Sequence, residues 1–176
     1  MVFSEHDPQE LRTGFNADGY VYLPGFIGSD GAKEVLTHLD RYVRDVVPDM
    51  PKTEVYYESI EDTGTLKQLQ RMHLYDSYFE SLFTTGPIRS LAQTLLNDEV
   101  VPVNMQYFNK PPRIGKPTPP HQDGYYFMLD PCEALTMWLA LDHVDTENGC
   151  VRYIPGSHRT GVREHGRTNT LGFSQG

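Results

Sequence analysis

The sequence predicts an α+β or mostly β protein, with short helices in its first half and antiparallel strands rolled into a sandwich or barrel afterwards. Apolar residues recur at helical spacing before residue 97 and follow strand-like patterns after residue 100. The 11 Tyr and 8 Phe favour strands, and the 15 Gly and 13 Pro indicate many turns. A chain of 176 residues fits one domain, here residues 1–176.

The first helix signal lies at the start of the chain. Asp7 can act as the N-cap, Pro8 suits the first helical position, and Glu10 can reach back toward the cap. Gly19 ends this helix, and residues 20–23 then form a short predicted strand.

The second helix is predicted to begin with Ser29 as its N-cap and to end before Pro48, because the residue before proline avoids the helical region. Its apolar face consists of residues spaced four, three and four apart, namely Val35, Leu39, Tyr42 and Val46. A third helix is predicted over residues 87–96.

Strand patterns dominate from residue 100 onward. Residues 100–109, 120–128, 134–142 and 151–154 are predicted strands, and residues 110–120, with five prolines, form a loop. Asn148-Gly149 indicates a tight turn before the last of these strands.

The charge excludes several partners. With 15 Lys and Arg against 24 Asp and Glu, the net charge is −9, which argues against nucleic acid or an anionic membrane as the main partner. No secretory signal or membrane-spanning run is evident, and two cysteines cannot form a disulfide framework. We therefore expect a cytoplasmic protein; the sequence gives no oligomeric state.

The segment His121-Gln122-Asp123 carries the clearest chemistry. Side chains two apart on a strand share a face, so His121 and Asp123 are expected to project together. An imidazole beside a carboxylate supplies two ligands of the 2-His-1-carboxylate triad that binds non-haem Fe(II). A His–Asp pair on the surface is the alternative, because H-x-D arises often by chance.

Further blocks surround this pair in order. They are D-G-Y-V and L-P-G-F near residues 18–26, Q-Y-F-N-K at 106–110, W-L-A-L-D at 138–142, E-N-G-C at 147–150 and P-G-S-H at 155–158. In this order the sequence resembles the phytanoyl-CoA dioxygenase family of Fe(II)/2-oxoglutarate oxygenases, from about residue 15 to the end. Nothing like H-E-x-x-H or a Gly-rich phosphate motif is present.

The resemblance implies a double-stranded β-helix, a cupin-like jelly roll with the N-terminal helices packed outside. It also implies that His121 and Asp123 bind Fe(II), with 2-oxoglutarate and O2 as cosubstrates, and that an aliphatic C–H bond of a small-molecule or acyl substrate is hydroxylated. The same resemblance implies that four residues contact the cosubstrate: Gln106, Asn109, Trp138 and Lys67. Alternatively, Gln106 and Asn109 are ordinary polar residues of a strand, Trp138 is an aromatic residue of the core, and Lys67 is an exposed lysine on a helix.

The sequence departs from the family at its end. The second iron histidine and the 2-oxoglutarate arginine are expected on late strands, and neither follows before Gly176. His143, His158 and His165 are weak candidates for the third ligand. We therefore expect a chain shortened at its C-terminus, an incomplete roll and no coupled activity from these 176 residues. A non-catalytic jelly-roll module that binds a ligand or partner is the alternative function; a cupin-type hydrolase would need more histidines.

Overall fold

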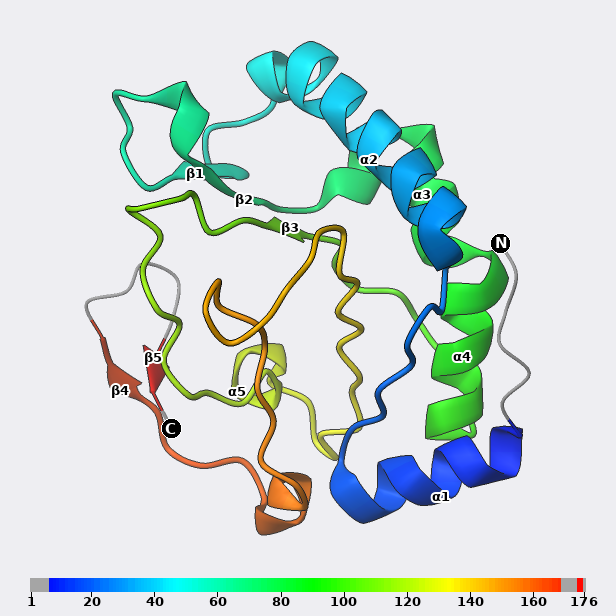
Figure 1. Cartoon of the computed structure of the whole chain (residues 1–176). Helices are drawn as coiled ribbons and strands as arrows, with labels where there is room; N and C mark the ends of the chain where they lie inside the picture. The colour runs from blue at the N-terminus through cyan, green and yellow to red at the C-terminus, as the bar shows by residue number, and fades with distance from the viewer. Residues whose placement is uncertain (1–6, 169–173, 176) are drawn as a thin grey trace.

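The computed structural model describes residues 7–168 and 174–175. Four longer helices form one side and the upper edge of the molecule in Figure 1, and loops fill the opposite side. The helices are α1 (Pro8–Asp18), α2 (Gly28–Asp45), α3 (Ser77–Thr84), α4 (Gly86–Leu96) and α5 (Gly124–Phe127), with 3-10 turns η1 (Val47–Asp49), η2 (Thr63–Thr65), η3 (Met72–Leu74) and η4 (Ser157–Thr160). No helix in the described ranges is long and apolar enough to cross a membrane.

Helix α1 begins and ends where the sequence predicts. The Asp7 carboxylate accepts a hydrogen bond from the backbone N–H of Gln9 at 2.8 Å, and Pro8 occupies the first turn. Gly19 ends the helix in the left-handed conformation, with φ of 83°. A residue with a Cβ is disfavoured at that φ, which explains why glycine occupies position 19.

Helix α2 packs on the core through its predicted face, with Val35, Leu39 and Tyr42 buried. The predicted Ser29 cap is wrong, because the helix begins at Gly28 and the preceding Ile27 makes no capping bond with its side chain. Burial of the apolar face, rather than a cap, therefore stabilises this end.

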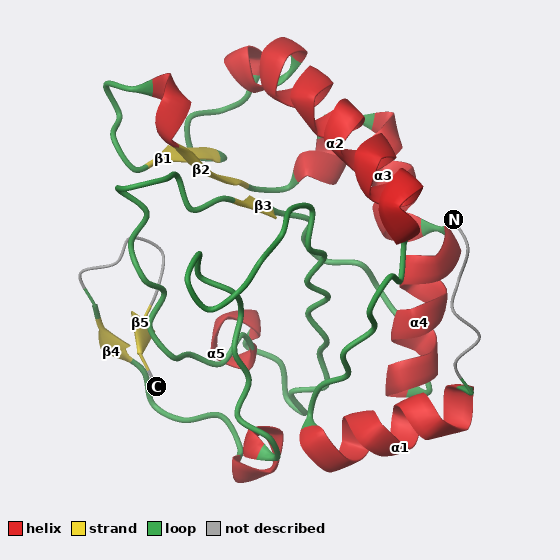
Figure 2. Ribbon diagram, viewed as in Figure 1, coloured by secondary structure: helices red, strands yellow, loops and turns green. Residues whose placement is uncertain are grey.

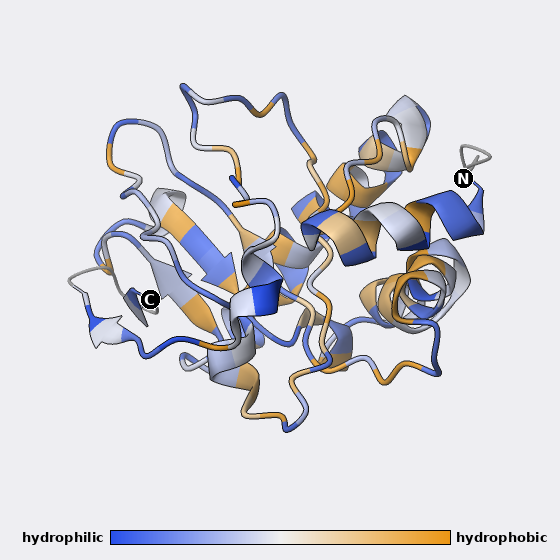
Figure 3. Ribbon diagram, turned by 90° about the horizontal axis from the view of Figure 1, so that it is seen from below, coloured by the Kyte–Doolittle hydropathy of each residue, from blue (hydrophilic) through white to orange (hydrophobic). Residues whose placement is uncertain are grey.

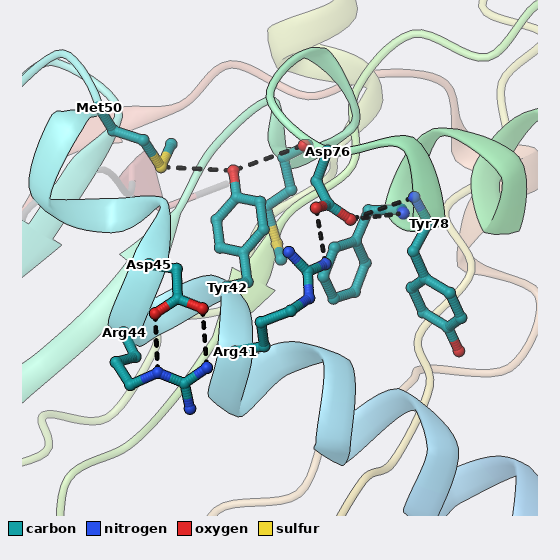
Figure 4. Close-up of polar contacts among 9 residues, drawn as sticks. Arg41, Tyr42, Arg44, Asp45, Met50, Asp76 and Tyr78 are labelled. Atoms are coloured by element: carbon teal, nitrogen blue, oxygen red, sulfur yellow. Dashed lines mark hydrogen bonds and ion pairs between the residues drawn. The ribbon is translucent and has the colours of Figure 1, made fainter.

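The core lies between the helices and the start of the sheet. Its members are Ile27, Val35, Leu39, Tyr42, Val47, Met50, Leu66, Leu69, Met72, Phe79 and Leu82. The Tyr42 hydroxyl contacts Met50 Sδ at 3.3 Å and donates to the carbonyl of Met72 at 3.4 Å (Figure 4). Its ring meets Phe79 edge to face, with centroids 5.3 Å apart.

Asp76 joins α2 to α3. One carboxylate oxygen lies 2.6 Å from Arg41 Nη2, and the other accepts from the backbone N–H groups of Tyr78 and Phe79 (Figure 4). Helix α3 was not predicted from the sequence. The predicted helix over residues 87–96 is confirmed as α4, which packs against α1 and α3.

The main sheet has three short antiparallel strands in the order β1-β2-β3. These are β1 (Val55–Tyr57), β2 (Leu66–Leu69) and β3 (Tyr107–Phe108), with Leu69 opposite both Val55 and Tyr107 (Figure 2). All four residues of β2 are buried. A second ribbon pairs β4 (Gly166–Arg167) with β5 (Ser174–Gln175).

Most of the predicted strands are wrong in the described residues. In the first half, residues 20–23 form no strand. In the second half, residues 134–142 and 151–154 form no strand, residues 120–128 contain α5, and only Tyr107 and Phe108 of residues 100–109 belong to a strand. The Asn148-Gly149 turn is confirmed, with φ of 93° at Gly149, but it joins two segments that do not pair.

Alternating apolar residues give a segment strand propensity, but a strand forms only when a neighbour supplies the ladder hydrogen bonds. The observed fold is therefore helices with small antiparallel sheets, and the described residues contain no closed barrel. Cys132 and Cys150 are both free thiols.

Candidate metal centre

His121 and Asp123 lie side by side. His121 Nε2 is 3.2 Å from Asp123 Oδ1, and their side chains are 22% and 42% exposed. The spacing predicts this proximity from a strand, but the local structure is a turn: Asp123 has φ of −58° and ψ of −34° and stands directly before α5. The two side chains meet because the backbone turns at Asp123.

The other ring nitrogen of His121 fixes how the imidazole faces Asp123. His121 Nδ1 lies 2.8 Å from the carbonyl oxygen of Pro119, which can only accept, so Nδ1 carries the hydrogen. In the neutral ring Nε2 therefore presents a lone pair to a carboxylate oxygen. Two acceptors at 3.2 Å need a cation between them, either a proton or a metal ion.

The pair shifts both pKa values in the directions expected of a bonded His–Asp couple. The hydrogen bond to Asp123 raises the pKa of His121, although burial opposes it. The same bond lowers the pKa of Asp123, and a hydrogen bond from Thr136 lowers it further. The site therefore stabilises the carboxylate and favours positive charge beside it.

This donor set fits Fe(II) as two of its protein ligands. One imidazole nitrogen and one carboxylate oxygen are two thirds of the facial triad, and a backbone carbonyl orients the imidazole as is common for metal-bound histidines. In the described ranges no group of three or more His, Cys, Asp or Glu could hold a metal ion. The role of His121 and Asp123 as ligands stays a prediction.

Aromatic side chains lie around this pair. Tyr126 meets the His121 ring edge to face, with centroids 6.2 Å apart. Burial raises the pKa of Tyr153, and the nearby charge of Asp123 raises it further. The Tyr153 ring stacks on the Tyr20 ring, with centroids 5.2 Å apart, and so joins two segments far apart in the sequence. Sequence reasoning missed this contact, because nothing local to either residue marks it.

Three of the predicted cosubstrate residues lie in or directly beside the main sheet, where each has a protein partner. Lys67 is on β2, not on an exposed helix, and its ammonium is 3.3 Å from the buried carboxylate of Glu58.

Gln106 and Asn109 lie directly before and after β3, and residues of β2 bind both of them. Gln106 accepts a hydrogen bond from Gln68 at 2.7 Å, and Asn109 donates its side-chain N–H to the carbonyl of Leu66 at 2.9 Å. A cosubstrate role stays a prediction for both residues and for Lys67.

Trp138 lies in an extended segment outside any strand and is 46% exposed. Thr136, which bonds Asp123, precedes it by two residues in the same segment. The segment that precedes the W-L-A-L-D block therefore contacts Asp123 through Thr136, and the role of Trp138 stays a prediction.

A second H-x-D pair provides an internal comparison. His143 Nε2 and Asp145 Oδ2 are also 3.2 Å apart, but the His143 side chain is 87% exposed. Asp145 Oδ1 accepts from the backbone N–H groups of Glu147 and Asn148, and these bonds lower its pKa. Asp145 therefore stabilises the Asn148-Gly149 turn. Of the two His–Asp pairs in the described residues, only the His121–Asp123 pair has an imidazole that a backbone carbonyl, that of Pro119, orients.

His158 of the P-G-S-H block lies against the end of α1. Its Nε2 is 3.2 Å from the carbonyl oxygen of Asn16, and the Gly156 N–H donates to the carbonyl of Asp18 at 2.8 Å. A Cβ on Gly19 would collide with the His158 ring. His158 thus closes the C-terminus of a helix, where carbonyls need partners.

Comparison with known proteins gives one family. The sequence model described as "Phytanoyl-CoA dioxygenase (PhyH)" matches residues 15–175. "Phytanoyl-CoA dioxygenase 1" of Oryza sativa subsp. japonica is 28% identical over 193 residues, covering 88% of this chain and 66% of the relative. "Phytanoyl-CoA dioxygenase domain-containing protein 1" of Bos taurus is 35% identical, with the same 88% and 66% covered.

The relative "Phytanoyl-CoA dioxygenase" of Arabidopsis thaliana is 26% identical, covering 84% of this chain and 64% of its own length. The chain thus spans slightly under two thirds of these curated relatives. No solved structure matches it.

Proposed function

Because the chain belongs to the phytanoyl-CoA dioxygenase family, we propose that it carries the Fe(II)-binding His–Asp pair of a 2-oxoglutarate-dependent dioxygenase that hydroxylates an aliphatic C–H bond of a small-molecule or acyl substrate. The observation that carries this proposal is the His121 imidazole, whose Nδ1 is held by Pro119 and whose Nε2 faces Asp123. When bound, Fe(II) supplies the redox chemistry by which O2 converts 2-oxoglutarate to succinate and CO2 and hydroxylates the substrate.

In this proposal the residues of this chain bind the metal ion and orient its ligands. His121 Nε2 and an Asp123 carboxylate oxygen would hold the Fe(II) as two of its ligands, and the remaining coordination positions would be open to other ligands, the cosubstrate and O2. A hydrogen bond from Thr136 stabilises the Asp123 carboxylate, and the Tyr126 ring meets the His121 ring edge to face, with centroids 6.2 Å apart.

The metal assignment is tested by anaerobic calorimetry with Fe(II) on three forms of the chain. We expect weak binding by the unmodified chain, loss of that binding in Asp123→Ala, and unchanged binding in Asp145→Ala, because the two carboxylates share spacing and distance but not surroundings. Equal loss in both variants, or binding that survives Asp123→Ala, would contradict the assignment.

Activity is tested on a protein of the relatives' full length that contains this chain. We expect 2-oxoglutarate consumption only with Fe(II), and its loss in Asp123→Ala. A protein that binds a small ligand yet consumes no 2-oxoglutarate under these conditions would instead be the non-catalytic jelly-roll module.

A further inference from the structure

Gln122 separates the two proposed ligands, and both ends of its side-chain amide bind a later segment of the backbone. Its Nε2 donates to the carbonyl of Gly161 at 3.0 Å, and its Oε1 accepts from the N–H of Arg163 at 2.7 Å. The side-chain amide of Gln122 thus makes one donated and one accepted hydrogen bond with the backbone of residues 161–163, as the backbone of a neighbouring strand would in a β-sheet. Gln122 thus ties the metal turn to residues about 40 positions later.

His165 binds the backbone at the same point. The N–H of Gln122 donates to His165 Nε2 at 3.0 Å, while His165 Nδ1 lies 2.8 Å from the carbonyl oxygen of Arg163. Because that carbonyl only accepts, Nδ1 carries the hydrogen and Nε2 is free to accept, so both nitrogens of one tautomer are used. The ring also stacks on Tyr125, with centroids 4.2 Å apart and planes 19° apart.

These bonds matter because the surrounding region has little other long-range backbone bonding. In the described part from residue 121 to 168, backbone–backbone hydrogen bonds outside the β4–β5 ribbon join near neighbours, with Gly156 to Asp18 as the exception. None of these residues is buried, and of the described residues in this region only Leu139 and Leu141 pack against the apolar core. The backbone between the proposed ligands therefore depends strongly on Gln122 and His165.

We propose that Gln122 and His165 are positioning residues that fix the geometry of the metal-binding turn by tying it to residues 161–165. The proposal rests on the proposed function, because it assumes that His121 and Asp123 bind the metal. The rotation of the backbone at Gln122 sets the angle between the two ligand side chains, so a tie on both its N–H and its amide limits that rotation. Groups that orient metal ligands in this way contribute about 10–100-fold to metal affinity.

The test uses Co(II) alone as the probe, with the full 176-residue chain. We expect Gln122→Ala and His165→Phe each to weaken Co(II) binding by about 10–100-fold and to alter the Co(II) ligand-field absorption band. His165→Phe keeps the aromatic stacking surface and removes both the acceptor for the Gln122 N–H and the donor to the Arg163 carbonyl. Gln122→Glu keeps the acceptor for Arg163 and loses the donor to Gly161, so its affinity should be intermediate.

Hydrogen exchange of the metal-free chain supplies a second readout. The Arg163 amide should exchange about tenfold faster in Gln122→Ala, a change of roughly 1.4 kcal/mol in local opening. Gln93→Ala is the matched control, because Gln93 also donates from its Nε2, to Glu99 on the surface, away from the turn. This variant should change neither measurement.

The outcomes separate the two proposals. If Asp123→Ala removes Co(II) binding while Gln122→Ala and His165→Phe bind and absorb like the unmodified chain, the positioning role is overturned and the metal assignment stands. If Asp123→Ala binds Co(II) normally, the metal assignment fails and the positioning role fails with it, whatever the exchange shows. If Gln122→Ala loses its helical circular dichroism, Gln122→Glu and His165→Phe decide by the same criteria.

Discussion

The two halves of the described chain differ in how they are held together. Residues 7–108 contain the four longer helices, the three-stranded sheet and the whole apolar core, whereas Pro111 is the only buried residue among those described after Leu95. Figure 3 shows apolar residues on the loops as well as on the helices, and large ones such as Met128, Trp138 and Ile154 are 91%, 46% and 69% exposed. Burial of apolar side chains stabilises the first half, whereas specific hydrogen bonds stabilise the conformation of the second half.

The difference matters for function because the candidate metal centre lies in the second half. A site held by hydrogen bonds such as those of Thr136 and Gln122 can open without loss of the core. Global stability and metal affinity should therefore respond to different substitutions.

The largest expected effect is in the core. Phe79→Ala should lower the free energy of unfolding by about 3–5 kcal/mol, because Phe79 is 2% exposed and its removal leaves a cavity. Trp138→Ala, although a larger truncation, should cost less than about 1 kcal/mol, since the side chain is 46% exposed. Urea unfolding followed by far-UV circular dichroism measures both; similar losses would remove the contrast between the halves.

A smaller effect is expected at Asp76, which caps α3 and pairs with Arg41. Asp76→Ala loses the cap and the ion pair and should cost about 2 kcal/mol. Asp76→Asn keeps the capping acceptor and should cost about half as much. The same urea titration applies, and equal costs for the two variants would show that the cap contributes nothing.

The smallest effect concerns alkaline pH. Burial raises the pKa of Tyr78 to about 12, and burial also raises the pKa of Tyr42. The unfolded chain loses these protons near pH 10 while the folded chain keeps them, so stability is full below pH 10 and falls as pH rises toward 12. Tyr78→Phe should reduce the fall in the urea midpoint between pH 9 and 11; an unchanged fall would contradict this.

The sequence predicts elements whose signals are local. The Asp7 cap, the Gly19 stop and the face of Val35, Leu39 and Tyr42 are all present. Helix α3 carried a comparable signal, Asp76 before Phe79 and Leu82, and could have been found.

Strands could not be predicted in the same way, because alternation at residues 134–142 says nothing about which segment pairs with them. Likewise, the spacing of His121 and Asp123 indicates that they are neighbours, but not that a turn brings them together. The hydrogen bond from the Gln122 N–H to His165 joins residues 43 positions apart, which no local pattern encodes.

The most direct test of the central claim is to locate a bound metal on the chain. Mn(II) added to the 15N-labelled protein broadens the amide signals nearest to it. We predict broadening centred on His121, Asp123 and the adjoining residues 161–165, with the His143–Asp145 pair unaffected. Broadening centred on Asp145, or spread evenly over the acidic surface, would contradict the account.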